Sequence, residues 1–234
     1  RCRELRLHFT GVKLYWAPIV AILRIGGLAA INPFCTLASV LVITAAMARF
    51  GTDVLAGYGI GARLEFLVVP MIFGLGAAST AMVGVHFGAR AVARAHTVAW
   101  TAAGFSAILA GAIGLVASLF PGLWANLFTA DEAVRAAARA YLQTVAPFYA
   151  FFGVATCLFF ASQGAGRVLW PVIAAVVRVV VIVGGSAVLA GNSGAQPAQY
   201  FMIIAAGMVA HALVTASAIR LGAWTGGNRQ GATR

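Results

Sequence analysis

Six long apolar segments limit what this chain can fold into more than any other feature of its sequence. Each has about 20 residues or more, the length at which an α-helix crosses the hydrocarbon core of a bilayer. Hydrophobic residues make up 62% of the chain and charged residues only 9%, against about 25% charged residues in a typical soluble domain. We therefore predict an all-α polytopic membrane protein with spans at 25–48, 54–86, 97–119, 137–162, 168–190 and 198–221.

The segments between these apolar runs are short and turn-like, as in GARAVARA and GNSGAQP. The runs are about twice the length of a barrel strand and do not alternate, which argues against a β-barrel. We predict a cytoplasmic or interfacial lead-in at 1–24, a six-helix bundle at 25–221 and a cytoplasmic tail at 222–234, with no soluble domain. The chain opens without Met, and we interpret it as part of a longer protein.

The net charge of +11 would suggest nucleic-acid binding in a soluble protein. Here the arginines lie between apolar runs and not on one continuous face, so we predict no nucleic-acid partner. Basic connections are instead typical of the cytoplasmic side of membrane proteins. One side would carry ten basic residues, and the other would carry only Arg49, Arg135 and Arg139. We therefore expect a multi-pass protein of the plasma (inner) membrane with both termini of the chain in the cytoplasm.

Most of the acidic residues have a structural interpretation. Thr129 followed three residues later by Glu132 is a capping-box signature for the fourth predicted span. Asp131 and Glu132 would then lie in the first helical turn, where the helix dipole favours negative charge.

Cysteine and histidine residues show no spacing typical of a metal site or of a catalytic centre. The chain has three cysteines, which we interpret as packing residues, and no HExxH or GxSxG motif. We therefore predict no enzyme activity, no catalytic residues, no metal and no cofactor. The histidines are scattered at His8, His86, His96 and His211.

Three charged residues lie inside apolar runs. Arg178 falls about 15 Å into the fifth predicted span, where a charge costs at least about 2.5 kcal/mol and needs a partner or an aqueous cavity. Arg63 and Glu65 lie two positions apart on the second predicted span, so they point to different sides of the helix. We predict Glu65 as the ion-coupling residue, because a carboxyl group in a low-dielectric cavity can take up a proton. Arg178 is its candidate partner or an independent substrate contact, and a structural ion pair between helices is the alternative. Arg63 is a further cavity candidate, and the alternative for Arg63 and Glu65 is a salt bridge at the outer rim of the cavity.

Several polar and proline residues are candidates for a moving cavity. Pro33, Pro70 and Pro147 lie inside predicted spans, where each removes a backbone hydrogen bond and bends the helix. Asn32 places a polar side chain beside the first of these bends, and we include it among the cavity candidates.

Four segments in register resemble the multidrug and toxic compound extrusion (MATE) family. They are RIGGLAA, the long run from RFGTDVLAGYGIGARLEF to GVHFGARAVARA, LFTADEAVRAAARAYL and SQGAGRVLWPVI. The resemblance covers about residues 15–222. It implies one six-helix lobe of a twelve-helix transporter, most simply the C-terminal lobe, that exports drugs or metabolites in exchange for protons or sodium by alternating access.

The resemblance also implies partners for this chain, and the sequence departs from the family pattern in its first and fourth helices. The partners would be a small-molecule substrate, the lipid bilayer and an N-terminal lobe of the same protein. Several family branches carry an acid in the first and fourth helices of this lobe, yet INPFCTLASVLVITAAMA and YLQTVAPFYAFFGVATCLFFASQ have none. Coupling would therefore fall to Glu65 or to the other lobe, and an amphipathic, zwitterionic or anionic substrate is as plausible as a cation. The alternatives are a flippase for lipid-linked precursors of the same superfamily, or a passive channel or scaffolding bundle.

Overall fold

The computed structural model describes residues 16–192 and 194–224, and every regular element in these ranges is helical. Six of its spans are long and apolar enough to cross a membrane, which confirms the predicted fold class. The elements are α1 (Trp16–Ala48), α2 (Thr52–Gly88), α3 (Val92–Leu119), α4 (Pro121–Ala125), α5 (Glu132–Val145), the 3₁₀ turn η1 (Ala146–Phe148), α6 (Tyr149–Gly164), α7 (Leu169–Ala190) and α8 (Pro197–Arg220).

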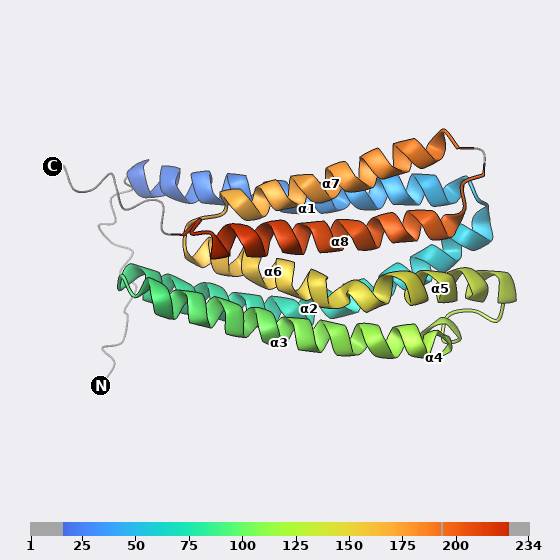
Figure 1. Cartoon of the computed structure of the whole chain (residues 1–234), viewed down its shortest axis with the longest axis horizontal. Coiled ribbons are helices and arrows are strands. Elements are labelled where there is room, and N and C mark those ends of the chain that lie inside the picture. Colours follow the sequence, from blue (N-terminus) through green and yellow to red (C-terminus); the bar gives the residue numbers. More distant parts are fainter. Residues whose placement is uncertain (1–15, 193, 225–234) are drawn as a thin grey trace, which may run out of the picture.

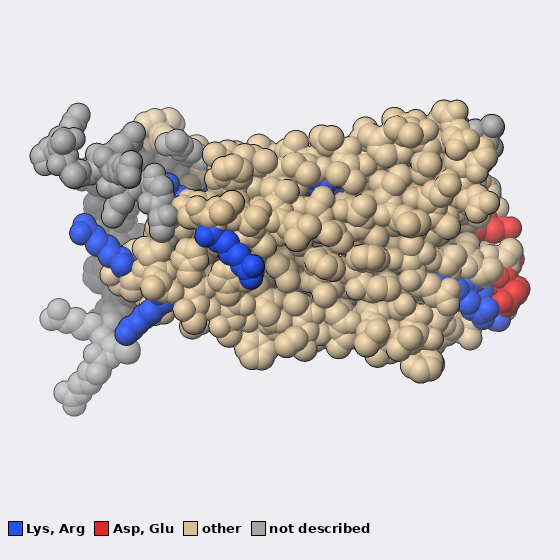
Figure 2. Space-filling view, viewed as in Figure 1, with Lys and Arg blue, Asp and Glu red and all other residues tan. Residues whose placement is uncertain are grey.

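The spans form an elongated bundle whose two ends differ in charge (Figures 1 and 2). Among the side chains that the structure describes, one end carries arginines and no acid; we name it the basic end. The other end carries both signs; we name it the mixed-charge end. The basic end holds Arg90, Arg94, Arg167 and Arg220, and the mixed-charge end holds Arg49, Arg135, Arg139, Asp53, Asp131 and Glu132.

The helices pack as two groups. One group consists of α1, α7 and α8, and the other consists of α2, α3 and the fourth span, which comprises α5, η1 and α6. Contacts of α8 with α5 and α6 join the two groups, whereas α1 and α2 touch each other only sparsely. In Figure 1, α1 therefore runs beside α7, whereas α2 runs beside α3.

The group of α2, α3 and α6 is held together by small residues. Ala95, Ala99 and Ala110 of α3 are fully buried, so neighbouring helices approach closely. A Cβ atom added to Gly153 of α6 would lie 2.5 Å from the Ser106 carbonyl oxygen of α3, a distance that leaves no space for a larger residue. Close contact of this kind replaces the hydrophobic driving force that helices lack within lipid.

The fourth span is broken near its middle and capped differently from our expectation. Pro147 lies in η1, where the chain passes from α5 into α6.

The predicted capping box of Thr129 and Glu132 is wrong, because Asp131 is the N-cap and its Oδ1 accepts from Ala133 N at 2.8 Å. Thr129 lies too early: its Oγ1 accepts from Asp131 N at 3.1 Å instead. Glu132 forms ion pairs with Arg135 and Arg139.

Candidate functional site

A cavity of about 320 Å³ lies between the two helix groups, and it contains the three intramembrane charges that the sequence singled out. Every span except α3 contributes to its wall, which is mostly aliphatic and aromatic. The lining residues are Thr36, Ser39, Val40, Ile43 and Thr44 of α1; Tyr58, Gly59, Ala62, Arg63, Glu65, Phe66 and Val69 of α2; Tyr141 of α5; Phe152 of α6; Arg178 and Ile182 of α7; and Ile204 and Met208 of α8.

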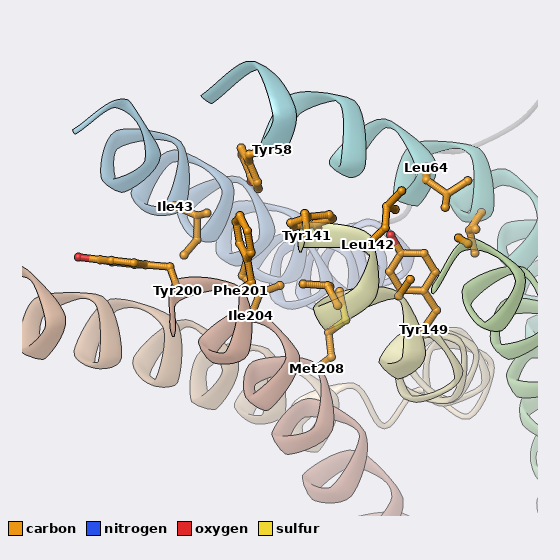
Figure 3. Packing of buried hydrophobic residues seen from close by; sticks show 14 of the residues in the cluster. Ile43, Tyr58, Leu64, Tyr141, Leu142, Tyr149, Tyr200, Phe201, Ile204 and Met208 are labelled. Carbon is orange, nitrogen blue, oxygen red and sulfur yellow. The ribbon is translucent and has the colours of Figure 1, made fainter. Parts of the chain in front are cut away.

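Glu65 is held by a tyrosine from the fourth span. The Tyr141 hydroxyl donates a hydrogen bond to Glu65 Oε1, which ties α5 to α2. The Tyr141 ring is fully buried and makes edge contacts with Tyr58 at 5.5 Å and Phe201 at 5.2 Å between centroids; all three lie close together in Figure 3. The aromatic contacts fix the direction of the hydroxyl and therefore the position of the carboxylate.

The sequence of α2 explains how Tyr141 comes so near. Gly61 lies opposite the ring, and a Cβ atom at this position would overlap the ring. One turn earlier, a Cβ atom on Gly57 would lie 2.7 Å from the carbonyl oxygen of Val134. The two glycines therefore allow α5 to lie directly against α2. Gly61 lies one helical turn before Glu65, so the Tyr141 ring that packs on it brings its hydroxyl within reach of the carboxylate.

Arg178 enters the same cavity from α7. It lies close enough to Glu65 for an electrostatic interaction, but the two side chains form no direct ion pair among the described contacts. Gly207 of α8 makes room for the arginine, since a Cβ atom there would lie 3.3 Å from Arg178 Cγ. The sequence-based pairing of Arg178 with Glu65 is therefore a through-space attraction, and the direct partner of the carboxylate is Tyr141.

Arg63 lies at the edge of the cavity towards the mixed-charge end. Its guanidinium carbon stands 5.3 Å from the centre of the Phe128 ring, which belongs to the connection between α4 and α5. Arg63 is exposed and also lines a shallow surface pocket with Thr129 and Val134. The sequence left open whether Arg63 and Glu65 lie in the cavity or at its rim: Glu65 lines it from within, and Arg63 forms its edge.

The remaining candidates lie elsewhere. Asn32 does not line the cavity, and its carbonyl oxygen accepts from Thr36 Oγ1 at 3.1 Å. Pro33 and Pro70 lie inside α1 and α2, which continue as helices through both positions. Among the described residues, no three His, Cys, Asp or Glu side chains are grouped as metal ligands.

The sequence did not lead us to Tyr141, whose hydroxyl donates to Glu65. A signal was present, because Val134, Ala138, Tyr141 and Val145 recur at helical spacing and share the buried face of α5. A tyrosine on such a face needs a hydrogen-bond partner for its hydroxyl. The sequence did not show which of the other helices would supply that partner.

Comparison with known proteins identifies the family of this fold. A family model described as MatE matches residues 29–188. The chain belongs to the MatE family. A curated relative, the probable multidrug resistance protein NorM of Thermotoga maritima, is 26% identical over 172 residues, which are 73% of this chain and 37% of that protein.

Solved structures of transporters share the fold. The Vibrio cholerae MATE transporter VcmN in its bent form has a TM-score of 0.78 at 20% identity over 89% of this chain and 48% of that chain. A transporter of Pyrococcus furiosus, described as having a binding pocket of reverse polarity, has a TM-score of 0.77 at 17% identity over 86% and 45%. This MatE chain therefore spans about half the length of the transporters it matches, and it has the fold of one six-helix lobe.

Proposed function

We propose that this chain is one lobe of a secondary-active exporter of small amphipathic compounds, driven by antiport of protons or sodium. The observation that carries the proposal is the cavity itself, in which one carboxylate and two arginines meet inside a membrane-spanning bundle. Charges at this depth are costly and are typical of substrate and ion pathways. Membership of the MatE family and similarity to a probable multidrug resistance protein support the transport class.

The cavity suggests how exchange would work. Glu65, when ionised, accepts from Tyr141 and is attracted by Arg178. Uptake of a proton removes the only negative charge among the described residues that line the cavity and leaves both arginines unbalanced. A bound proton and a bound cationic group of a substrate would therefore compete for one carboxylate, which is the requirement for antiport. Zwitterionic or anionic amphipathic compounds also fit, because Arg63 and Arg178 outnumber Glu65.

The interface between the two helix groups suggests where movement would occur. The cavity lies between groups that are joined mainly through α8, while α1 and α2 have few contacts. A second six-helix lobe packed against this side would complete the site and allow it to open alternately to either side of the membrane. We place the basic end in the cytoplasm of an inner-membrane protein, because arginines without acids are favoured there.

The test compares the protein that contains this chain with its Glu65→Gln variant in proteoliposomes. Substrate efflux is measured against an imposed proton gradient and, separately, against a sodium gradient. Asp53→Asn is the matched control, because Asp53 is an exposed carboxylate at the start of the same helix and lies outside the cavity. We expect Glu65→Gln to lower gradient-driven efflux at least tenfold and Asp53→Asn to leave it unchanged, with both proteins correctly folded.

Each result has a distinct meaning. The gradient that drives wild-type efflux identifies the coupling ion. Wild-type efflux in a folded Glu65→Gln variant would place coupling outside this cavity and contradict the proposed role of Glu65. Equilibration of substrate down its own gradient, with no dependence on either ion, would favour a passive channel and contradict antiport.

A further inference from the structure

A second cavity, of about 470 Å³, lies at the basic end in the groove between the start of α7 and the end of α8. It shares no residue with the central cavity. Arg167 is the only charged side chain among its described lining residues. The others are Trp170, Val214, Ser217, Ala218, Leu221, Gly222 and Ala223.

The groove combines a positive charge with apolar walls. Arg167 is half-buried and forms no ion pair with a described residue. Trp170 keeps 46% of its surface exposed, and Leu221 keeps 87%. A tryptophan that is both apolar and able to donate a hydrogen bond is typical of the membrane interface. A ligand here would therefore meet one cation, one indole and a hydrocarbon surface together.

Two helix ends build this groove. After α6, Gly166 has φ +66°, and the Arg167 N–H donates to the Ser162 carbonyl oxygen at 2.9 Å. After α8, the Ala223 N–H donates to the Ala218 carbonyl oxygen at 3.0 Å. The chain therefore turns sharply after both helices, at the basic end of the bundle. These turns bring the arginine beside the last apolar residues of α8.

We propose that this groove binds one anionic phospholipid, with its phosphodiester on Arg167 and its glycerol and acyl chains along Trp170, Val214 and Leu221. Charge complementarity favours the occupant, since all described charged side chains at this end are arginines (Figure 2). Basic pockets between helices on the cytoplasmic side are known sites for anionic headgroups. The apolar wall favours a lipid over a soluble phosphate, because a free anion would gain nothing from Val214 or Leu221.

The neighbouring arginine at this end is used differently. The Arg220 guanidinium carbon lies 4.6 Å from the centre of the Trp100 ring on α3, and Arg220 does not line the groove. Arg94 is exposed, lies at the same end and also stands outside the groove. Replacing Arg94 is therefore the control for replacing Arg167, because it removes one positive charge from the same end of the molecule but not from the groove.

The experiment measures lipid retention by the protein that contains this chain, purified with mixtures of phosphatidylglycerol and phosphatidylcholine and examined by native mass spectrometry. We expect Arg167→Gln to lower the ratio of retained phosphatidylglycerol to phosphatidylcholine about fivefold, the effect of one basic residue near an anionic headgroup. Arg167→Lys should keep most of the preference, and Arg94→Gln should leave it unchanged. Wild-type melting temperatures should also rise with phosphatidylglycerol and not with phosphatidylcholine.

Three results would overturn the proposal. Equal losses in Arg167→Gln and Arg94→Gln would indicate general surface charge. Equal retention of both lipids by the wild type would indicate an apolar groove without headgroup recognition. Displacement of the bound lipid by inorganic phosphate alone would indicate a soluble anion site. Because Glu65 lies outside this groove, Glu65→Gln should retain lipid normally, so a failure of the transport proposal remains distinguishable from a failure of this one.

Discussion

The interior of the α2, α3 and α6 group differs sharply from the interface between the two helix groups. In the first, glycine and alanine face one another, and Thr80 of α2 donates to the Phe160 carbonyl oxygen of α6 at 2.8 Å. In the second, large side chains and three charges surround a cavity of about 320 Å³. The same chain therefore contains a region of close helix contacts and a region that keeps space open among charged side chains.

The difference shows how this protein accommodates charge within the membrane. A cavity with room for water and a few polar side chains in a mostly apolar wall lowers the cost of Glu65 and Arg178, which close-packed helices would not do. The close-packed group in turn holds α2 rigidly, so that the position of Glu65 is fixed by a helix that cannot easily shift. We interpret the first region as the support and the second as the working site.

The largest effect is expected where the close-packed region is disrupted. Gly153→Val places a branched side chain against the Ser106 carbonyl oxygen, a backbone atom that cannot move aside. We expect the free energy of unfolding to fall by about 3 kcal/mol, because overpacking forces the backbones apart. Thermal unfolding in detergent measures the change. Gly104→Val on α3 is the control, since nothing lies within 4 Å of a Cβ atom at Gly104; equal losses in both variants would show that close packing is not the cause.

A smaller effect is expected for Tyr141→Phe in the working site. The change keeps the ring and removes the hydroxyl that donates to Glu65. A hydrogen bond to a charged group contributes about 1.5–3 kcal/mol. We therefore expect the free energy of unfolding to fall by about 1.5 kcal/mol, the lower end of this range. We expect gradient-driven efflux to fall several-fold. Tyr200→Phe is the control, because its buried ring packs on Phe50 and its hydroxyl makes no hydrogen bond to a described residue. An equal fall in efflux in both variants would show that the Tyr141 hydroxyl has no specific role in the site.

The smallest effect is expected outside both regions. Asp131→Ala removes the N-cap of α5 and leaves the N–H groups of Ala133 and Val134 without their acceptor. We expect a loss of about 1 kcal/mol in unfolding free energy and unchanged efflux. Asp53→Ala is the comparison, since Asp53 accepts only from the adjacent Thr52 side chain. An Asp131→Ala protein that lost efflux without losing stability would mean that the loop between α4 and α5 belongs to the working site.

The spans were predictable because hydrophobicity and length are local properties of the sequence. Five predicted spans each coincide with one helix, and the fourth coincides with α5, η1 and α6 together. The ends differ because caps and interfacial turns extend beyond the apolar core. The cap of α5 was assigned wrongly for a related reason. Thr129 and Asp131 are both good capping residues, and the choice depended on where the backbone left its extended conformation.

The site was predictable only in part. Arg63, Glu65 and Arg178 stand out because an isolated charge in an apolar run is conspicuous. Tyr141 does not stand out, since its role follows from the pairing of α5 with α2 at Gly61, and such a pairing joins residues 80 positions apart. The position of Asn32 outside the cavity has the same origin, because the direction in which α1 faces depends on its contact with α7.

The short length of α6 has a consequence for how the protein is made. Its 16 residues extend about 24 Å, which is less than the hydrocarbon thickness of about 30 Å. The remaining distance is covered by η1 and the last turns of α5, so this span crosses the bilayer with a break at Pro147. The span packs against α8 as well as α2, and α8 is the last of these helices to be synthesised. A chain arrested after the fourth span would lack the contacts with α8, and it should be more sensitive to quality-control proteases than the complete lobe.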